Sequence, residues 1–159
     1  MGSKPPLIKI GNRGKGVSNI LFFLPSEKEF APIAAHFIKH GSKDIQTVFV
    51  LHESGLPFYS NQVTQNMITF SDKDLNQFGL IRSEQLLDRI RSKRFDALVD
   101  LNRNLDQTLS LLALELDIPM KIGFQSPLAE NLYTMVIEPS PNGFLESSYE
   151  TIERLLGLA

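Results

Sequence analysis

The sequence contains no cysteine among its 159 residues. Disulfide bonds are therefore excluded, as are thiolate nucleophiles and zinc or iron–sulfur sites built on cysteine ligands. The fold must be stabilised by packing and hydrogen bonds rather than by disulfide bonds.

The sequence also lacks a long apolar run. The longest run, Ile20–Leu24, is far shorter than the roughly 20 residues that span a bilayer. No apolar signal-peptide core follows the polar start at Met1. We therefore expect a cytoplasmic protein without a transmembrane segment.

An excess of positive charge is missing too. Lysine and arginine number 16 against 18 aspartates and glutamates, which gives a formal net charge of −2. Binding to a phosphate backbone normally requires a strongly basic face, so nucleic acid is not an expected partner. The hydrophobic content of 42% is ordinary for a globular protein.

What the chain does have is an alternation of apolar runs and amphipathic segments. Residues 1–18 are rich in Gly, Pro, Lys and Arg and predict a flexible basic arm, which leaves 19–159 as a single domain. Unbroken apolar runs are typical of parallel strands covered on both faces. Predicted strands are 19–24, 47–51, 67–70, 95–100, 121–124 and 134–137, and predicted helices are 26–41, 83–93, 105–117 and 147–158. This order predicts an α/β, Rossmann-like three-layer domain with a mainly parallel sheet.

A ligand crevice is expected beyond the carboxyl ends of strands 19–24 and 95–100, where the strand order reverses. The loops there are dense in short polar side chains, which suit sugar hydroxyls or an anion. The candidate substrate-binding residues are Ser26, Asn102, Arg103, Asn104, Asp106 and Gln107. A structural interpretation is also open: Asn104 caps the next helix with Gln107 at its third position, and Arg103 is a solvated surface residue.

Two carboxylates near the same crevice, Glu27 and Glu29, are candidates for a catalytic base. Glu29 has a structural alternative, because Ser26-x-x-Glu29 has the spacing of a helix capping box. The spacing recurs at Ser147-x-x-Glu150, where it predicts the start of the last helix.

Other patterns point away from common chemistries. The glycine-rich residues 11–16 precede the first strand, whereas a dinucleotide or phosphate loop must follow a strand, so no cofactor is expected. His36 and His40 are four positions apart but lack the glutamate of the His-Glu-x-x-His motif, and no metal is expected. His52 is the third histidine. No Ser/His/Asp constellation can be assembled from the motif spacing, so an independent hydrolase is not favoured.

The leucines of the predicted helix 105–117 exceed what one sheet-facing stripe needs. Leu111 and Leu114 fall outside that stripe. They predict an interface with a second domain or a second copy of the chain, unless residues 125–133 cover them.

Three consecutive segments carry a family resemblance. The strand sequence 94–102, the leucine-rich helix 105–116 and the Ile-Gly-Phe strand 121–124 resemble, in the same order, the N-terminal domain of bacterial ADP-heptose–lipopolysaccharide heptosyltransferases, glycosyltransferase family 9. The closing segment 149–158 is similar to the helix that ends that domain. The resemblance extends over residues 19–158.

The resemblance implies one half of a two-domain GT-B glycosyltransferase. It implies an acceptor-side domain in lipopolysaccharide or cell-surface glycan synthesis, with a sugar or glycolipid acceptor, at the inner face of the cytoplasmic membrane. The family's Gly-Asp pair after the first strand is absent here, where residues 24–30 read Leu-Pro-Ser-Glu-Lys-Glu-Phe, so Glu27 or Glu29 would have to substitute. The family's donor-binding domain is also absent from this sequence. We therefore expect a domain that is inactive alone; the alternative is a non-catalytic interaction domain that kept the fold and lost the sugar site.

Overall fold

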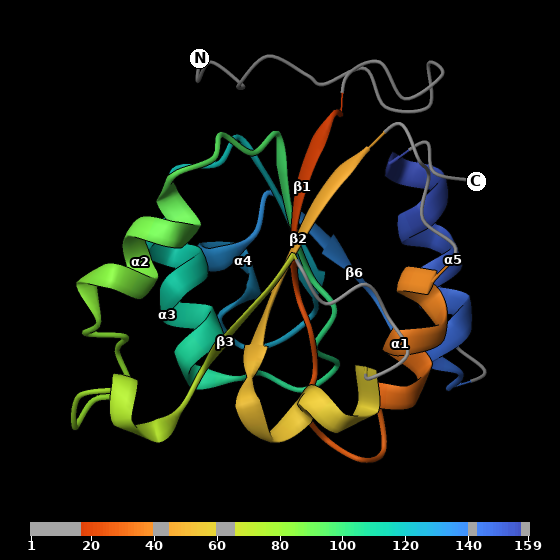
Figure 1. Cartoon of the computed structure of the whole chain (residues 1–159). Coiled ribbons are helices and arrows are strands. Elements are labelled where there is room, and N and C mark those ends of the chain that lie inside the picture. Colours follow the sequence, from red (N-terminus) through yellow and green to blue (C-terminus); the bar gives the residue numbers. More distant parts are fainter. Residues whose placement is uncertain (1–16, 40–44, 60–65, 140–142, 157–159) are drawn as a thin grey trace.

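The computed structural model describes residues 17–39, 45–59, 66–139 and 143–156, which form one all-parallel sheet with helices on both faces (Figure 1). The strand order is β3-β2-β1-β4-β5-β6. The strands are β1 Asn19–Phe23, β2 Gln46–His52, β3 Met67–Phe70, β4 Ala97–Asp100, β5 Met120–Phe124 and β6 Met135–Ile137. The predicted α/β, Rossmann-like three-layer architecture is confirmed.

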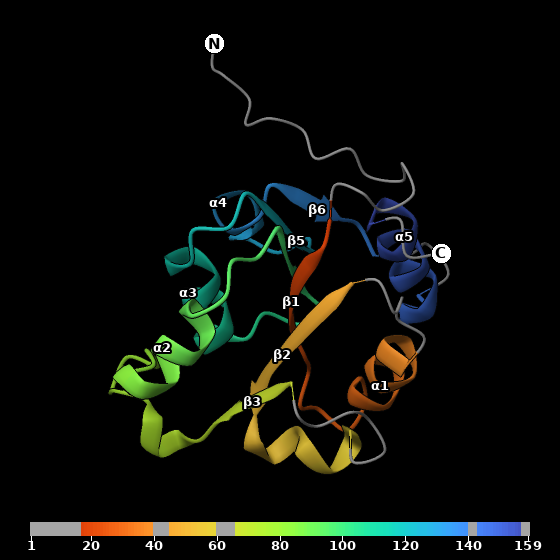
Figure 2. The ribbon, with the colours of Figure 1, turned by 45° about the horizontal axis from the view of Figure 1, so that its top comes forward.

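The helices divide between the two faces of the sheet. One face carries α1 Ala31–Lys39 and α5 Leu145–Leu156, which lie side by side (Figure 1, Figure 2). The other carries α2 Glu84–Arg91 and α3 Gln107–Glu115, and the short α4 Ala129–Leu132 packs against α3 and β5. Two 3₁₀ helices, η1 Glu53–Tyr59 and η2 Asp72–Asp74, follow β2 and β3.

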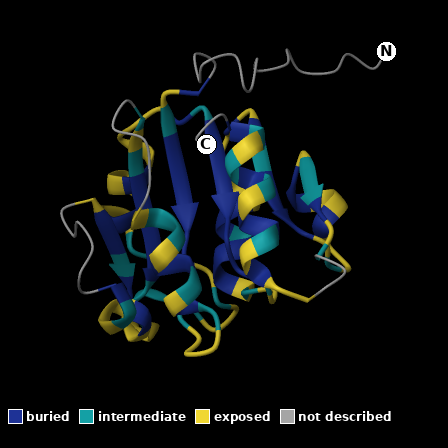
Figure 3. Ribbon diagram, turned by 90° about the vertical axis from the view of Figure 1, so that its right-hand side faces the viewer, coloured by how far each residue is buried: buried dark blue, intermediate teal, exposed yellow. Residues whose placement is uncertain are grey.

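Strand β1 forms the centre of the core because its side chains are apolar on both faces. Ile20 and Phe22 pack toward α1 and α5, whereas Leu21 and Phe23 pack toward α2 and α3. None of the four is more than 3% exposed, and each fully buried side chain of this kind contributes about 1.5–3 kcal/mol. Figure 3 shows the buried strands and the exposed outer sides of the helices.

The folded part of the chain already includes residues 17 and 18. Val17 is buried, and the backbone N–H groups of Ser18 and Asn19 donate to Oδ2 of Asp96 over 2.7 and 3.0 Å. Asp96 thereby links the start of β1 to the segment before β4. The rest of the predicted basic arm, residues 1–16 with the glycine-rich 11–16, lies outside the described residues, as do His40 and Gly41.

The predicted helix starts at the two Ser-x-x-Glu sequences are wrong. Helix α1 begins five residues later than Ser26, at Ala31, because residues 27–30 form a turn. Helix α5 begins at Leu145, so Ser147 and Glu150 lie inside it. The buried side chain of Leu145 docks on the core and extends this helix toward its N-terminus.

Candidate functional site

The reversal of strand order, where the sequence predicts a crevice, lies between the carboxyl ends of β1 and β4. The two strands are neighbours, with Phe23 paired to Asp100. From them the chain proceeds to opposite sides of the sheet, to β2 and to β5. The loops 24–30 and 101–106 therefore meet at the lower edge of the sheet in Figure 1. In open α/β sheets ligands bind at this place.

One side-chain hydrogen bond joins these two loops. The Nδ2 of Asn104 donates to Oε2 of Glu27 over 3.2 Å, and both side chains are exposed. A residue predicted as a catalytic base and a residue predicted to bind substrate are thus brought together across the crevice. The carboxylate and the amide remain open to solvent on their outer side.

Two other predicted binding residues serve the structure of α3. Asp106 is the N-cap of this helix, and its Oδ1 accepts the N–H of Leu109 over 2.9 Å. The Nε2 of Gln107 donates to the carbonyl oxygen of Phe78 over 2.9 Å. The interpretation that Asn104 caps the helix is therefore wrong, because the cap lies two residues later and Asn104 reaches Glu27 instead.

The remaining candidates lie at the rim of the crevice. Ser26 is half-buried, and its Oγ donates to the carbonyl oxygen of His52 over 3.5 Å. Arg103 is half-buried and Glu29 is exposed. Glu29 lies in the turn before α1 and is not the third residue of that helix.

A buried carboxylate closes the base of the crevice. Asp100 ends β4 and is 2% exposed. Its Oδ1 accepts the backbone N–H and the Nδ2 of Asn102 over 3.0 and 2.8 Å, and its Oδ2 accepts the hydroxyl of Tyr133 over 2.7 Å. Burial raises the pKa of Asp100 to about 6, although the hydrogen bonds from Tyr133 and Asn102 act in the opposite direction. Asn102, predicted to bind substrate, is buried and holds Asp100 instead.

Tyr133 reaches Asp100 only because residue 123 is glycine. A Cβ atom at Gly123 would lie 2.2 Å from Cζ of Tyr133. The Ile-Gly-Phe sequence of β5 thus admits the tyrosine ring beneath the crevice. Sequence reasoning singled out this strand but missed Tyr133, and the glycine inside an otherwise apolar strand was the available signal.

Two further buried tyrosines fix the crevice loops from below. The hydroxyl of Tyr59 donates to the carbonyl oxygen of Pro25, and that of Tyr149 donates to the carbonyl oxygen of Leu101, both over 2.7 Å. Burial raises the pKa of both phenols, which therefore remain protonated donors at neutral pH. Each loop is thus held at a backbone carbonyl oxygen.

A third loop approaches the crevice from β2. A Cβ atom at Gly55 would lie 2.6 Å from Oγ of Ser26, so the start of η1 packs directly on the loop after β1. This brings His52 and its neighbours next to the predicted site residues. No spacing in the sequence predicts that His52 lies next to Ser26.

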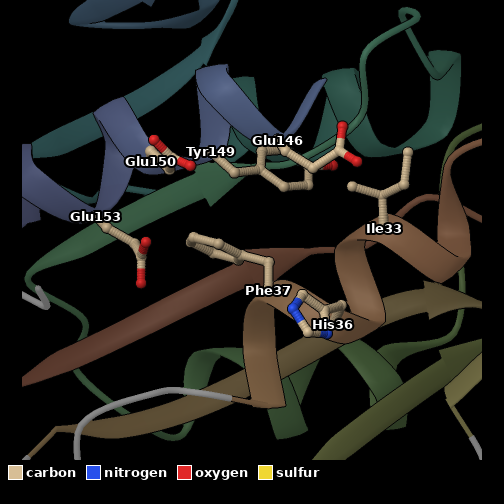
Figure 4. Close-up of a pocket in the computed structure, with 7 residues that line it drawn as sticks. All are labelled: Ile33, His36, Phe37, Glu146, Tyr149, Glu150 and Glu153. Atoms are coloured by element: carbon tan, nitrogen blue, oxygen red, sulfur yellow. The ribbon is translucent and has the colours of Figure 1, made fainter. Parts of the chain in front are cut away.

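A separate groove of about 320 Å³ lies between α1 and α5 (Figure 4). In Figure 4, Ile33 and Phe37 rise from α1 toward α5, while Glu146, Glu150 and Glu153 project from α5. The groove is also lined by His36, the histidine considered for metal binding. None of the residues predicted for the crevice lines it.

Among the described residues no group of three or more His, Cys, Asp or Glu side chains is arranged to hold a metal. Within the same residues no helix combines the length and apolar character required to cross a bilayer.

The structure defines a Rossmann-like α/β domain in which two tyrosine-anchored loops meet at the reversal of strand order. The chain matches, over residues 15–155, a protein family described as a family of unknown function (DUF6913), and it belongs to this family. Neither a curated protein nor a solved structure gives a significant match.

Proposed function

We propose that the chain binds a sugar or glycolipid at the crevice between β1 and β4, as the acceptor-side domain of a system resembling the family 9 glycosyltransferases. The observation that supports this is the hydrogen bond between Asn104 and Glu27, which places an exposed amide and an exposed carboxylate side by side above the strand ends. Such pairs donate to and accept from vicinal hydroxyl groups. The loops beneath them are already fixed by Tyr59 and Tyr149, so little ordering entropy is lost on binding.

Of the two carboxylates considered as a base, Glu27 is the one we propose. Its carboxylate accepts a hydrogen bond from Asn104 of the opposite loop, whereas Glu29 lies two residues further along the turn. Glu27 would accept a proton from an acceptor hydroxyl, and Arg103 would hold a phosphate or carboxylate of the acceptor. Transfer also needs a donor site, which another domain or chain would supply, so the domain is inactive alone. The setting proposed is the cytoplasm, at the inner face of the membrane, in lipopolysaccharide or cell-surface glycan synthesis.

The test is an NMR titration of the ¹⁵N-labelled chain with ADP, an ADP-sugar and a lipopolysaccharide core oligosaccharide. We expect shifts at residues 26–29 and 102–107 with the oligosaccharide. Asn104→Ala and Glu27→Gln should each weaken binding by up to about tenfold, the effect of losing one or two hydrogen bonds. Ser92→Ala, an exposed change at the end of α2, is the control and should leave binding unchanged. Absence of shifts with all three ligands would overturn the proposal.

A second candidate function, a non-catalytic protein-interaction domain, is favoured by the exposed apolar side chains around α3. Leu111 is half-buried, but Leu114 is 57% exposed, Leu105 44% and Phe78 62%. Where exposed apolar side chains gather on a surface, they mark an interface. Sedimentation velocity would show concentration-dependent association that Leu114→Glu abolishes. A monomer at all concentrations would speak against a second copy of the chain as the partner.

A further inference from the structure

Three polar side chains form a hydrogen-bonded chain beyond the carboxyl ends of β2 and β3. Nδ1 of His52 lies 2.8 Å from Oγ of Ser54, and its Nε2 lies 3.0 Å from Oδ1 of Asp72. Both distances are within the range that joins a nucleophile, a base and its orienting carboxylate. Motif spacing did not assemble these three residues, because Asp72 lies in η2, after β3, and only the parallel pairing of β3 with β2 brings it to His52.

The tautomer of the imidazole follows from its partners. Nδ1 also receives the backbone N–H of Ser54 over 3.1 Å. A backbone N–H can only donate, so Nδ1 carries no proton in the neutral ring. Nε2 therefore carries it and donates to Asp72. The lone pair of the base faces Ser54, which is the orientation needed to take the hydroxyl proton.

The imidazole is held in this orientation by packing as well. The ring of Phe70 meets it edge to face, with centroids 5.3 Å apart and planes at 88°. His52 and Phe70 are register partners at the ends of their strands. The His52 side chain is 25% exposed and that of Asp72 90%. Water therefore screens the hydrogen bond between His52 and Asp72, and its role is to fix the ring.

We propose that Ser54 is a nucleophile activated by His52 and oriented through Asp72, and that it accepts acyl groups from activated esters. Oγ of Ser54 attacks the carbonyl carbon while Nδ1 of His52 takes its proton. The ester C–O bond then breaks, and His52 returns the proton to the departing alkoxide. Water, deprotonated by the same nitrogen, hydrolyses the acyl-serine and restores the hydroxyl.

The substrate class follows from the exposure of the site. Ser54 is exposed at the first turn of η1, so the developing oxyanion is in contact with water. Such a site suits esters with good leaving groups, such as aryl esters. This inference is independent of the sugar-binding proposal, because its residues and its readout differ: a covalent adduct at Ser54 rather than reversible shifts at residues 26–29 and 102–107.

The test is covalent labelling of the full chain with a fluorophosphonate probe, with the modified residue located by peptide mass spectrometry. Label is expected at Ser54 and is lost in Ser54→Ala. His52→Gln should slow labelling by at least about tenfold, since a positioned general base contributes about 10²–10⁴-fold. Asp72→Asn should give a smaller loss. Matched controls are Ser92→Ala, an exposed serine that donates to a backbone carbonyl, and His36→Gln on α1; neither should change the rate.

A second measurement does not depend on the folding of the variants. Labelling of the unaltered chain at Ser54 should be lost when the chain is unfolded in urea before the probe is added, because His52 is then no longer positioned as a base. Label at another residue, no label at Ser54, or an equal rate in a folded His52→Gln variant would overturn the proposal and leave the three residues as a structural turn.

Discussion

The hydroxyl of Tyr133 donates a 2.7 Å hydrogen bond to Oδ2 of Asp100, and both groups are buried beneath the crevice. The bond joins the end of α4 to the end of β4. It also gives a charged group in the core one of the few partners that can offset its desolvation. The pKa of Asp100 and the stability of the domain are therefore coupled.

Asp100 makes the domain less stable as the pH rises through the weakly acidic range. Its pKa in the folded state is about 6, above the ordinary value of 3.8 for an aspartate. The folded chain therefore binds a proton between about pH 4 and 6 that the unfolded chain releases, and stability falls across that interval by about 3 kcal/mol. Urea unfolding at several pH values should show the decline in the unaltered chain but not in Asp100→Asn. If the difference in the free energy of unfolding between the unaltered chain and Asp100→Asn did not change with pH, Asp100 would not be the group responsible.

Tyr133→Phe should lower the free energy of unfolding at pH 7 by about 1–3 kcal/mol, the cost of depriving a buried group of its partner. The loss should be smaller at pH 4, where Asp100 is protonated in the folded state. Tyr149→Phe is the matched control, because it removes a bond of the same length to the neutral carbonyl of Leu101. Its effect should be independent of pH. Equal pH dependence in the two variants would refute a special role for the Tyr133–Asp100 pair.

Gly123→Ala should destabilise the domain by about 3 kcal/mol or more, at the upper end of the cost of overpacking. The cause is steric, since the new Cβ would meet the ring of Tyr133 at 2.2 Å. Thermal unfolding of Gly123→Ala, Tyr133→Ala and the double variant tests this. The loss of stability in the double variant should be smaller than the sum of the losses in the two single variants, because Tyr133→Ala removes the ring with which the new Cβ clashes. Strict additivity would mean that the glycine serves another purpose.

Asp106→Ala should cost about 0.5–2 kcal/mol through loss of the α3 cap. Asn104→Ala should leave stability nearly unchanged, because its amide bonds an exposed carboxylate and exposed polar pairs contribute little. Chemical denaturation of the two variants distinguishes the cap seen in the structure from the one inferred from the sequence. A larger loss in Asn104→Ala than in Asp106→Ala would reverse the assignment.

The sheet and the meeting of the loops 24–30 and 101–106 could be predicted because they depend on local patterns. The apolar runs of β1 and β4 indicate parallel strands, and their order fixes where the two loops meet. The partners inside the site could not be predicted in this way. Tyr133 and Asp100 are 33 positions apart, and no spacing rule connects them.

The helix starts were mispredicted for a related reason. A Ser-x-x-Glu spacing describes a local preference worth about 1 kcal/mol. Burial of Leu145 outweighs it at α5, and at α1 the hydroxyl of Ser26 meets the end of β2 instead. His52 and Asp72 show the same limit, since only the pairing of β2 with β3 brings them together.

The central position of β1 has a consequence for how the chain acquires its structure. This strand, near the beginning of the chain, pairs with β4, and Asp96 completes the hydrogen bonds at its start. The chain between β1 and β4 must close into a long loop before the hydrogen bonds between these two strands form, and this makes folding slow. During synthesis, the first half of the chain emerges with one edge of β1 unpaired until β4 has left the ribosome. That edge is the part of the nascent chain most exposed to aggregation.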